Sequence, residues 1–218
     1  MKKLLVAGLL LSLSLFTAMS VSAYTISIPG GVGGMPTYGG EYVGPIGAQL
    51  DGAIIKNGIT CVDFNSTTYV PNSGFSVTVE TLSPVSLLNA RFQSADTLLK
   101  YQEAAWLNTQ IHMTANQSKI GEIQYAMWEI FLPADAKKKL SDAEQGNVSN
   151  WLKMAGLIDF SMYDFSSVRI YTPLKGDTNQ EFISGDIAPV PEPGTLVLLG
   201  AGMFGLVIYG KRRMGKDS

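Results

Sequence analysis

The sequence predicts an α+β fold, with β-strands flanking a central layer of about three helices, in a single globular domain over residues 41–188. Three observations lead to this prediction. Apolar and polar residues alternate over residues 75–81, which is typical of a half-buried strand. Helix-spaced apolar residues then occupy residues 95–155, and short β-branched stretches follow them. Strands and helices that are segregated along the chain are typical of the α+β class.

The N-terminus has the three parts of a secretory signal peptide. A pair of lysines precedes the apolar residues 4–16, and a run of small residues ends at Ala23. This order predicts a signal peptide over residues 1–23, with cleavage after Ala23. A first membrane helix is the alternative, but the apolar run is short for a span.

The first half of the domain is predicted to contain strands. Residues 24–40 are rich in Gly and Pro, so we expect a leader of turns and loops there. Residues 59–64 are β-branched and aromatic and follow the turn signal Asn57-Gly58, which indicates a strand. Residues 75–81 form the alternating strand.

The middle of the chain is predicted to be helical. Residues 95–110 and 120–132 carry apolar side chains among helix formers, and Pro133 ends the second of these stretches. A third helix is predicted over residues 134–155, closed by Gly156. The strands at 168–172 and 180–183 complete the domain. About 165 residues lie between the signal peptide and the C-terminal tail, which is enough to bury a core.

Composition excludes several functional classes. Between residues 24 and 189 the chain has ten Lys and Arg against sixteen Asp and Glu, so this region is acidic and we expect no nucleic-acid partner. Cys61 is the only cysteine and His112 the only histidine, so no intrachain disulfide can form and a Cys/His zinc site lacks ligands. We expect no metal and no cofactor. No Gly-x-Ser-x-Gly or phosphate-binding loop occurs, and we expect no turnover enzyme, although a pair of catalytic carboxylates cannot be located from the sequence.

The C-terminal residues 189–218 have the pattern of a membrane-stop device. Pro191-Glu192-Pro193 precedes the apolar residues 195–210, and the basic cluster Lys211-Arg212-Arg213 follows. The apolar segment is near the lower limit for a transmembrane helix, and the basic residues favour a cytoplasmic end.

This tail resembles the PEP-CTERM sorting signal of exopolysaccharide-making Gram-negative bacteria. The resemblance implies export through the inner membrane and anchoring there until an exosortase, a membrane-embedded cysteine protease, cuts near Pro191-Glu192-Pro193. The protein would then reach the cell surface or the extracellular space. A permanent single-span membrane anchor is the alternative.

Two short motifs in the domain also form a pattern. Cys61 is followed by Val62 and Asp63, and Gln124 lies in the strongly apolar stretch Ile123–Trp128. Taken in order, the two motifs resemble the thioester domains of bacterial surface adhesins over residues 40–172. That resemblance implies a bond between the Cys61 thiol and the Gln124 side chain, and an adhesive role.

The implied chemistry is attack of the Cys61 thiolate on the Gln124 carboxamide with loss of ammonia. The resulting thioester would react with an amine of the extracellular matrix or of a surface. Asp63 is two residues along the predicted strand from Cys61 and could influence the thiol pKa, and His112 could assist proton transfer. Three readings stay open for these residues. Cys61 and Gln124 could be core residues of a non-covalent structural or carbohydrate-binding protein of the exopolysaccharide layer, Asp63 could be a turn-binding carboxylate, and His112 could be an ordinary surface residue.

Overall fold

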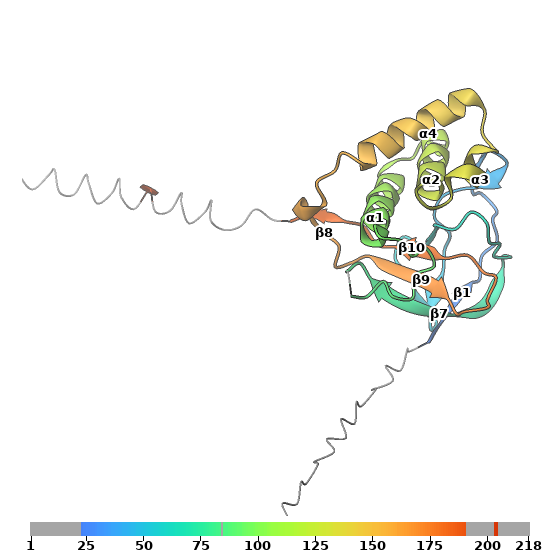
Figure 1. Ribbon diagram of the computed structural model, residues 1–218. Coiled ribbons are helices and arrows are strands. Elements are labelled where there is room, and N and C mark those ends of the chain that lie inside the picture. Colours follow the sequence, from blue (N-terminus) through green and yellow to red (C-terminus); the bar gives the residue numbers. More distant parts are fainter. Residues whose placement is uncertain (1–22, 84, 191–202, 205–218) are drawn as a thin grey trace, which may run out of the picture.

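A curled antiparallel sheet carries a layer of helices on one face in the computed structural model, which describes residues 23–83, 85–190 and 203–204 (Figure 1). The helices are α1 (Thr97–Met113), α2 (Gln117–Phe131), the short α3 (Pro133–Lys137) and α4 (Asp142–Ala155). The strand order in the sheet is β5-β4-β1-β7-β9-β10-β6. This arrangement confirms the predicted α+β class.

The seven strands of the sheet are β1 (Tyr24–Ile28), β4 (Gln49–Leu50), β5 (Ala53–Ile54), β6 (Thr60–Cys61), β7 (Asn72–Thr81), β9 (Arg169–Pro173) and β10 (Phe182–Ser184). Two further pairs lie outside it, namely β2 (Thr37–Tyr38) with β3 (Glu41–Tyr42), and β8 (Tyr163–Asp164) with β11 (Ala188–Pro189). A 3₁₀ turn, η1 (Phe160–Met162), precedes β8.

The sheet curls until its two edges nearly meet. Ile46, just before β4, forms a two-way backbone bridge with Ile59, just before β6, and both N···O distances are 2.9 Å. The segments that precede β4 and β6 are therefore joined, although β4 lies next to one edge strand and β6 forms the opposite edge of the sheet.

Successive side chains along β9 and β10 point to opposite faces of the sheet, and both faces are buried there. In β9, Ile170 belongs to the core under the helices, whereas Tyr171 belongs to a second core inside the curl. In β10, Ile183 and Phe182 divide in the same way. Cys61 packs against both cores, so it lies where the two meet.

Three segments differ from the expectations based on sequence. The expected leader over residues 24–40 begins instead with β1, an inner strand of the sheet whose Ile26 and Ile28 are fully buried. The expected helix over residues 134–155 is divided into α3 and α4, because Ser141 starts a new helix with a capping box to Glu144. The expected strand over residues 59–64 is reduced to β6.

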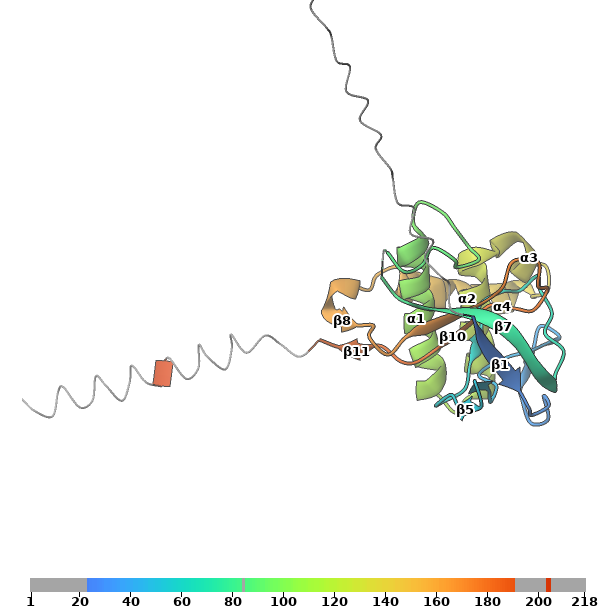
Figure 2. The ribbon, with the colours of Figure 1, turned by 90° about the horizontal axis from the view of Figure 1, so that it is seen from below.

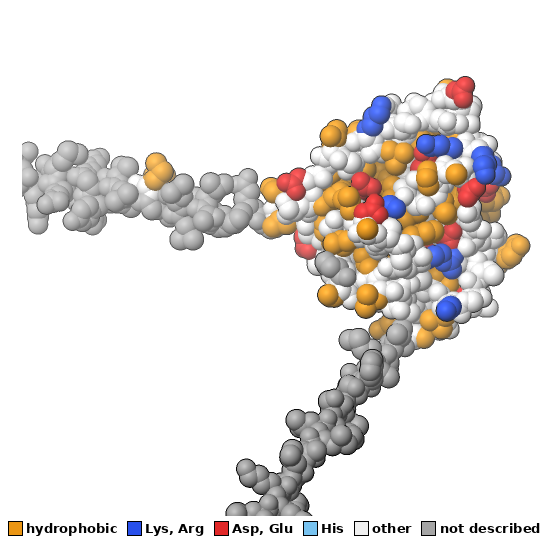
Figure 3. Space-filling model, viewed as in Figure 1, with side chains coloured by type: hydrophobic (Ala, Val, Ile, Leu, Met, Phe, Trp, Pro, Cys, Tyr) orange, Lys and Arg blue, Asp and Glu red, His pale blue; other side chains and the backbone are white. Residues whose placement is uncertain are grey.

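The first and last strands of the domain, β1 and β11, lie on well-separated sides of the body (Figures 1 and 2). On the face shown in Figure 3, positive and negative side chains are interspersed with exposed apolar ones. Within the described ranges, every helix falls short of the combination of length and apolar character that a membrane crossing requires. The signal peptide predicted for residues 1–23 lies outside the described residues except at Ala23, and the apolar segment 195–210 does so except at Met203 and Phe204.

Candidate functional site

Strand β6 places Cys61 at an edge of the sheet. Cys61 is opposite Phe182 of β10, and the N–H of Val62 donates to the Glu181 carbonyl oxygen at 3.0 Å. The strand ends there, and the chain turns away at Asp63. Cys61 is partly exposed, although its backbone is fixed on the β10 side.

Helix α2 places Gln124 against this edge. Asn116 caps the N-terminus of the helix, because its side chain accepts a hydrogen bond from the Lys119 N–H at 3.1 Å. Gln124 is fully buried in the middle of the helix. The Gln124 Nε2 donates to the Cys61 carbonyl oxygen at 2.7 Å, and its Oε1 accepts from the Gly44 N–H at 3.3 Å. The structure therefore brings together the two residues that the sequence analysis paired.

Gly44 can donate to Gln124 because it is a glycine. Its φ is +93°, which side-chain-bearing residues rarely adopt, and an added Cβ would lie 2.9 Å from Cγ2 of Ile120. The sequence analysis did not identify Gly44, because its hydrogen bond to Gln124 joins residues 80 positions apart and no local sequence pattern predicts it.

The thiol of Cys61 is surrounded by backbone groups of Asp63. It donates to the Asp63 carbonyl oxygen at 3.1 Å, and the Asp63 N–H donates to the sulfur at 3.3 Å. Burial raises the thiol pKa to about 12, and the charges of Asp63 and Glu181 add to the rise, while the backbone N–H of Asp63 and the nearby indole of Trp128 oppose it. The thiol is therefore neutral near pH 7.

A pocket of about 400 Å³ opens over the pair. Cys61, Gln124 and Trp128 line it together with Gly44 and the residues around Asn65–Thr68. An ion pair between Glu41 and Lys139, 3.2 Å apart, also lies along it, and both of these side chains are about half exposed. A small nucleophile can therefore reach the pair from solvent.

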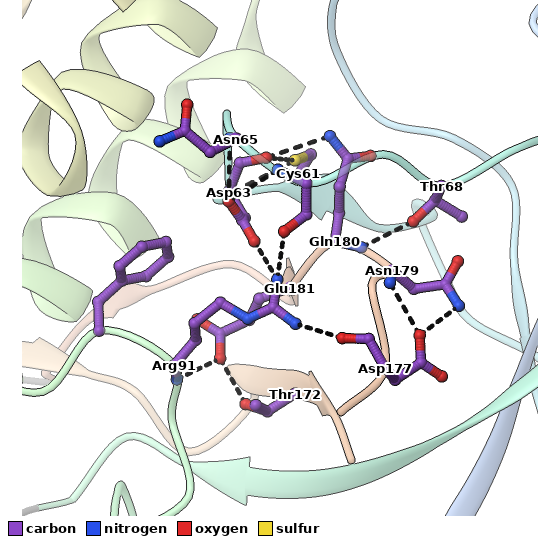
Figure 4. Close-up of polar contacts among 12 residues, drawn as sticks. Cys61, Asp63, Asn65, Thr68, Arg91, Thr172, Asp177, Asn179, Gln180 and Glu181 are labelled. Atoms are coloured by element: carbon purple, nitrogen blue, oxygen red, sulfur yellow. Dashed lines mark hydrogen bonds and ion pairs between the residues drawn. The ribbon is translucent and has the colours of Figure 1, made fainter. Parts of the chain in front are cut away.

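The carboxylate of Asp63 is engaged away from the thiol. It forms an ion pair with Arg91 and accepts from the N–H groups of Asn65 and Ser66 at 3.1 and 3.3 Å (Figure 4). Because Asp63 is only 2% exposed, these partners are what allow a buried charge there. Its expected influence on the thiol thus comes through its backbone groups and through its charge, which raises the thiol pKa.

Glu181 forms the centre of a second buried polar group below Asp63 (Figure 4). Its carboxylate accepts from the Arg91 N–H at 2.7 Å, from the Thr172 hydroxyl at 2.5 Å and from the Tyr101 hydroxyl. Burial raises the pKa of Glu181 to about 7, although these donors lower it. This group ties β10 to α1 and to the loop that carries Arg91.

His112 lies elsewhere. It is near the end of α1, where its Nδ1 is 2.5 Å from Oδ1 of Asp186, and it is not among the residues that line the pocket. The structure therefore does not bring His112 to the Cys61–Gln124 pair. Within the described part of the chain, no cluster of three or more His, Cys, Asp or Glu side chains could hold a metal ion.

Comparison with protein families finds a match to the PEP-CTERM protein-sorting motif at residues 189–213. Neither the curated proteins nor the solved structures include a significant match to the chain. The matched range contains Pro191-Glu192-Pro193 and Lys211-Arg212-Arg213, which lie outside the described residues. The motif implies an exported protein that is processed by an exosortase and sorted to the cell surface.

Proposed function

We propose that the globular domain of this exported protein attaches covalently to an extracellular partner through a thioester between Cys61 and Gln124. One observation carries the proposal, namely that the Gln124 amide is hydrogen-bonded to the Cys61 backbone at 2.7 Å beneath an open pocket. Export to the surface, which the sorting motif implies, brings such a domain to its partners.

The contacts of Gln124 suit an acyl-transfer step. The Gly44 N–H donates to the carboxamide oxygen, which is the atom that becomes negative when sulfur attacks the carbon. The Cys61 carbonyl oxygen accepts from the amide nitrogen and so orients the leaving group. The carbon between them is thus polarised and held in place.

The bond changes balance without another reagent. The Cys61 sulfur bonds to the Gln124 carboxamide carbon, the C–N bond breaks, and the nitrogen leaves as ammonia with the thiol proton. A partner amine then attacks the same carbon, the C–S bond breaks, and the sulfur recovers a proton from the amine. The product is an amide between Gln124 and the partner.

The raised thiol pKa also favours a stable thioester. A thiolate that burial destabilises is a poor leaving group, so hydrolysis is slow, whereas an amine is a stronger nucleophile than water. We therefore propose a matrix or surface amine as the partner. The reaction is stoichiometric, so the protein is not a turnover enzyme.

Mass spectrometry of the native protein purified from the cell envelope tests the proposal. We expect the wild type to be lighter by one ammonia than its processed sequence and to gain one methylamine on treatment. Cys61→Ala should keep the mass of its sequence in both samples. A wild type of full mass, with a thiol that reacts in the native state, would exclude the thioester.

The second candidate function is a non-covalent structural or carbohydrate-binding protein of the exopolysaccharide layer. One observation favours it. Both the oxygen and the nitrogen of the Gln124 amide have backbone partners, so holding α2 against β6 is a sufficient role for this residue. In that case Cys61→Ala leaves binding to matrix polysaccharide unchanged, and no covalent product forms.

A further inference from the structure

The indole N–H of Trp128 is a buried donor that takes no part in the contacts between Cys61 and Gln124. Trp128 is only 3% exposed, and its Nε1 makes no hydrogen bond to any residue in the described part of the chain. A buried donor without an acceptor loses its hydration without compensation, so such groups are rare and call for an explanation.

Trp128 lies one helical turn after Gln124 on α2, so both side chains are on the same face of that helix. Both line the pocket, together with Cys61. The indole is also held in place, because its ring packs against Phe64 and Tyr125 with centroids 5.0 and 4.9 Å apart. The unpaired N–H therefore has a fixed position at the site.

The sulfur of Cys61 lies beside the indole in the same pocket and is the candidate acceptor for this N–H. The indole lies close enough to lower the pKa of the thiol against the effect of burial, yet it makes no full hydrogen bond with the neutral thiol. The Asp63 N–H already donates to the same sulfur at 3.3 Å. Two donors thus converge on one atom, and one of them lacks an acceptor while the thiol is neutral.

We propose that Trp128 is a catalytic residue whose indole N–H stabilises negative charge on the Cys61 sulfur, together with the N–H of Asp63. The inference rests on the proposed function and adds a residue to it. Sulfur carries negative charge both when it loses its proton to attack Gln124 and when it departs before an incoming amine. The indole keeps its own proton in both steps, so it accelerates formation and discharge of the thioester alike.

With this assignment, hydrogen-bond donors stabilise the negative charge on both the Gln124 carboxamide oxygen and the Cys61 sulfur. The Gly44 N–H faces the carboxamide oxygen, and the N–H groups of Asp63 and Trp128 face the sulfur. Gln124 and Trp128 are therefore both required on one helix face, which accounts for their spacing on α2.

The first test uses Trp128→Phe, which keeps an aromatic ring and removes the N–H. The matched control is Trp106→Phe, at a buried tryptophan of α1 that packs on Trp151 and does not line the pocket. We expect Trp128→Phe to slow the reaction of the thioester with methylamine by about tenfold or more, since hydrogen bonds to charged groups are strong. The control should react at the wild-type rate.

A second measurement does not depend on the thioester. In the Gln124→Ala background the thiol is free, and its alkylation by iodoacetamide at a fixed, mildly alkaline pH reports the thiolate fraction. Adding Trp128→Phe should lower that rate by a similar factor, whereas adding Trp106→Phe should not. Circular dichroism of each variant checks that the fold is kept.

The outcomes separate the two proposals. If the wild type has no thioester but Trp128→Phe still slows alkylation, the proposed function fails and the donor role of Trp128 stands. If both reactions proceed at the rates of the Trp106→Phe controls, Trp128 is only a packing residue and the inference is wrong.

Discussion

The amide of Gln124 is fully buried and divides its hydrogen bonds between two distant segments, at Cys61 and at Gly44. A buried amide in an apolar helix face needs such partners, because an unpaired polar group loses its hydration without compensation. The same contacts that could activate Gln124 therefore also stabilise the fold, and each role has its own experimental signature.

In a Cys61→Ala background, where no thioester can form, Gln124→Leu should lower the free energy of unfolding by about 2–4 kcal/mol. It leaves the Gly44 N–H and the Cys61 carbonyl oxygen without their partner. Urea denaturation of the two proteins measures the difference. Equal midpoints would show that Gln124 does not hold α2 in place.

Glu181 should give the stability a pH dependence of a recognisable sign. Burial raises its pKa in the folded protein to about 7, above the ordinary value of 4.5, so the folded state binds its proton more tightly than the unfolded state. This contribution is fully present below about pH 4.5 and is lost as the pH rises through 7, with a slope of at most about 1.4 kcal/mol per pH unit.

Denaturation of the wild type and Glu181→Gln across this pH range measures the effect. The difference between the two proteins should change between pH 4.5 and 7, because glutamine does not titrate. Carboxylates elsewhere, such as Asp135 and Glu144, have a lowered pKa and give a slope of the opposite sign, but they are common to both proteins. A constant difference would contradict the raised pKa of Glu181.

Helix α2 packs closely against β2 at a glycine. Gly121 of α2 sits on Tyr38 of β2, and a Cβ added there would lie 2.3 Å from Cγ of the ring. Gly146 of α4 is also helical, but nothing lies within 4 Å of the corresponding position. The two glycines differ in packing and share the same backbone conformation class.

Gly121→Ala should destabilise the protein by about 1–3 kcal/mol, because the ring and the helix must separate. Gly146→Ala should instead stabilise it by about 0.5–1 kcal/mol, through the better helix propensity of alanine. Thermal unfolding of both variants gives the comparison. A stabilised Gly121→Ala protein would show that α2 does not need this close contact.

The helical layer shows what the sequence could and could not reveal. Periodic apolar residues located the helices, and the division between α3 and α4 was also visible in principle, since Ser141 and Glu144 have the spacing of a capping box. The strand β1 was missed because Tyr24–Ile28 adjoins a Gly-rich stretch, and only its partners β4 and β7 make it a strand.

Some residues of the candidate site could be predicted from the sequence and others could not. Cys61 and Gln124 were paired through a family resemblance, and the structure places them in contact. Gly44 and the donor role assigned to Trp128 could not be found, because both depend on contacts between segments far apart in the chain. His112, which could have assisted proton transfer, contacts Asp186 instead and is not among the residues that line the pocket.

For the complete domain, β1 is an essential inner strand despite its position near the predicted cleavage site. We expect a protein that begins at Pro29 to be unfolded, because it lacks the buried Ile26 and Ile28 and leaves β4 and β7 unpaired on one side. Tyr24→Ala, at a partly exposed side chain of the same strand, is the control and should remain folded. Circular dichroism and amide dispersion in NMR spectra distinguish the two, and a cooperative transition in the shortened protein would contradict the prediction.

Strand β7 pairs on one side with β1, from the start of the described chain, and on the other with β9, from near its end. A polypeptide that is exported through a translocation channel emerges N-terminus first. The strands of the sheet therefore cannot all pair until residues near 184 have crossed. Such pairing between distant parts of a chain is slow to form. Newly exported molecules thus have open strand edges until these partners have crossed, and such edges favour pairing with other chains.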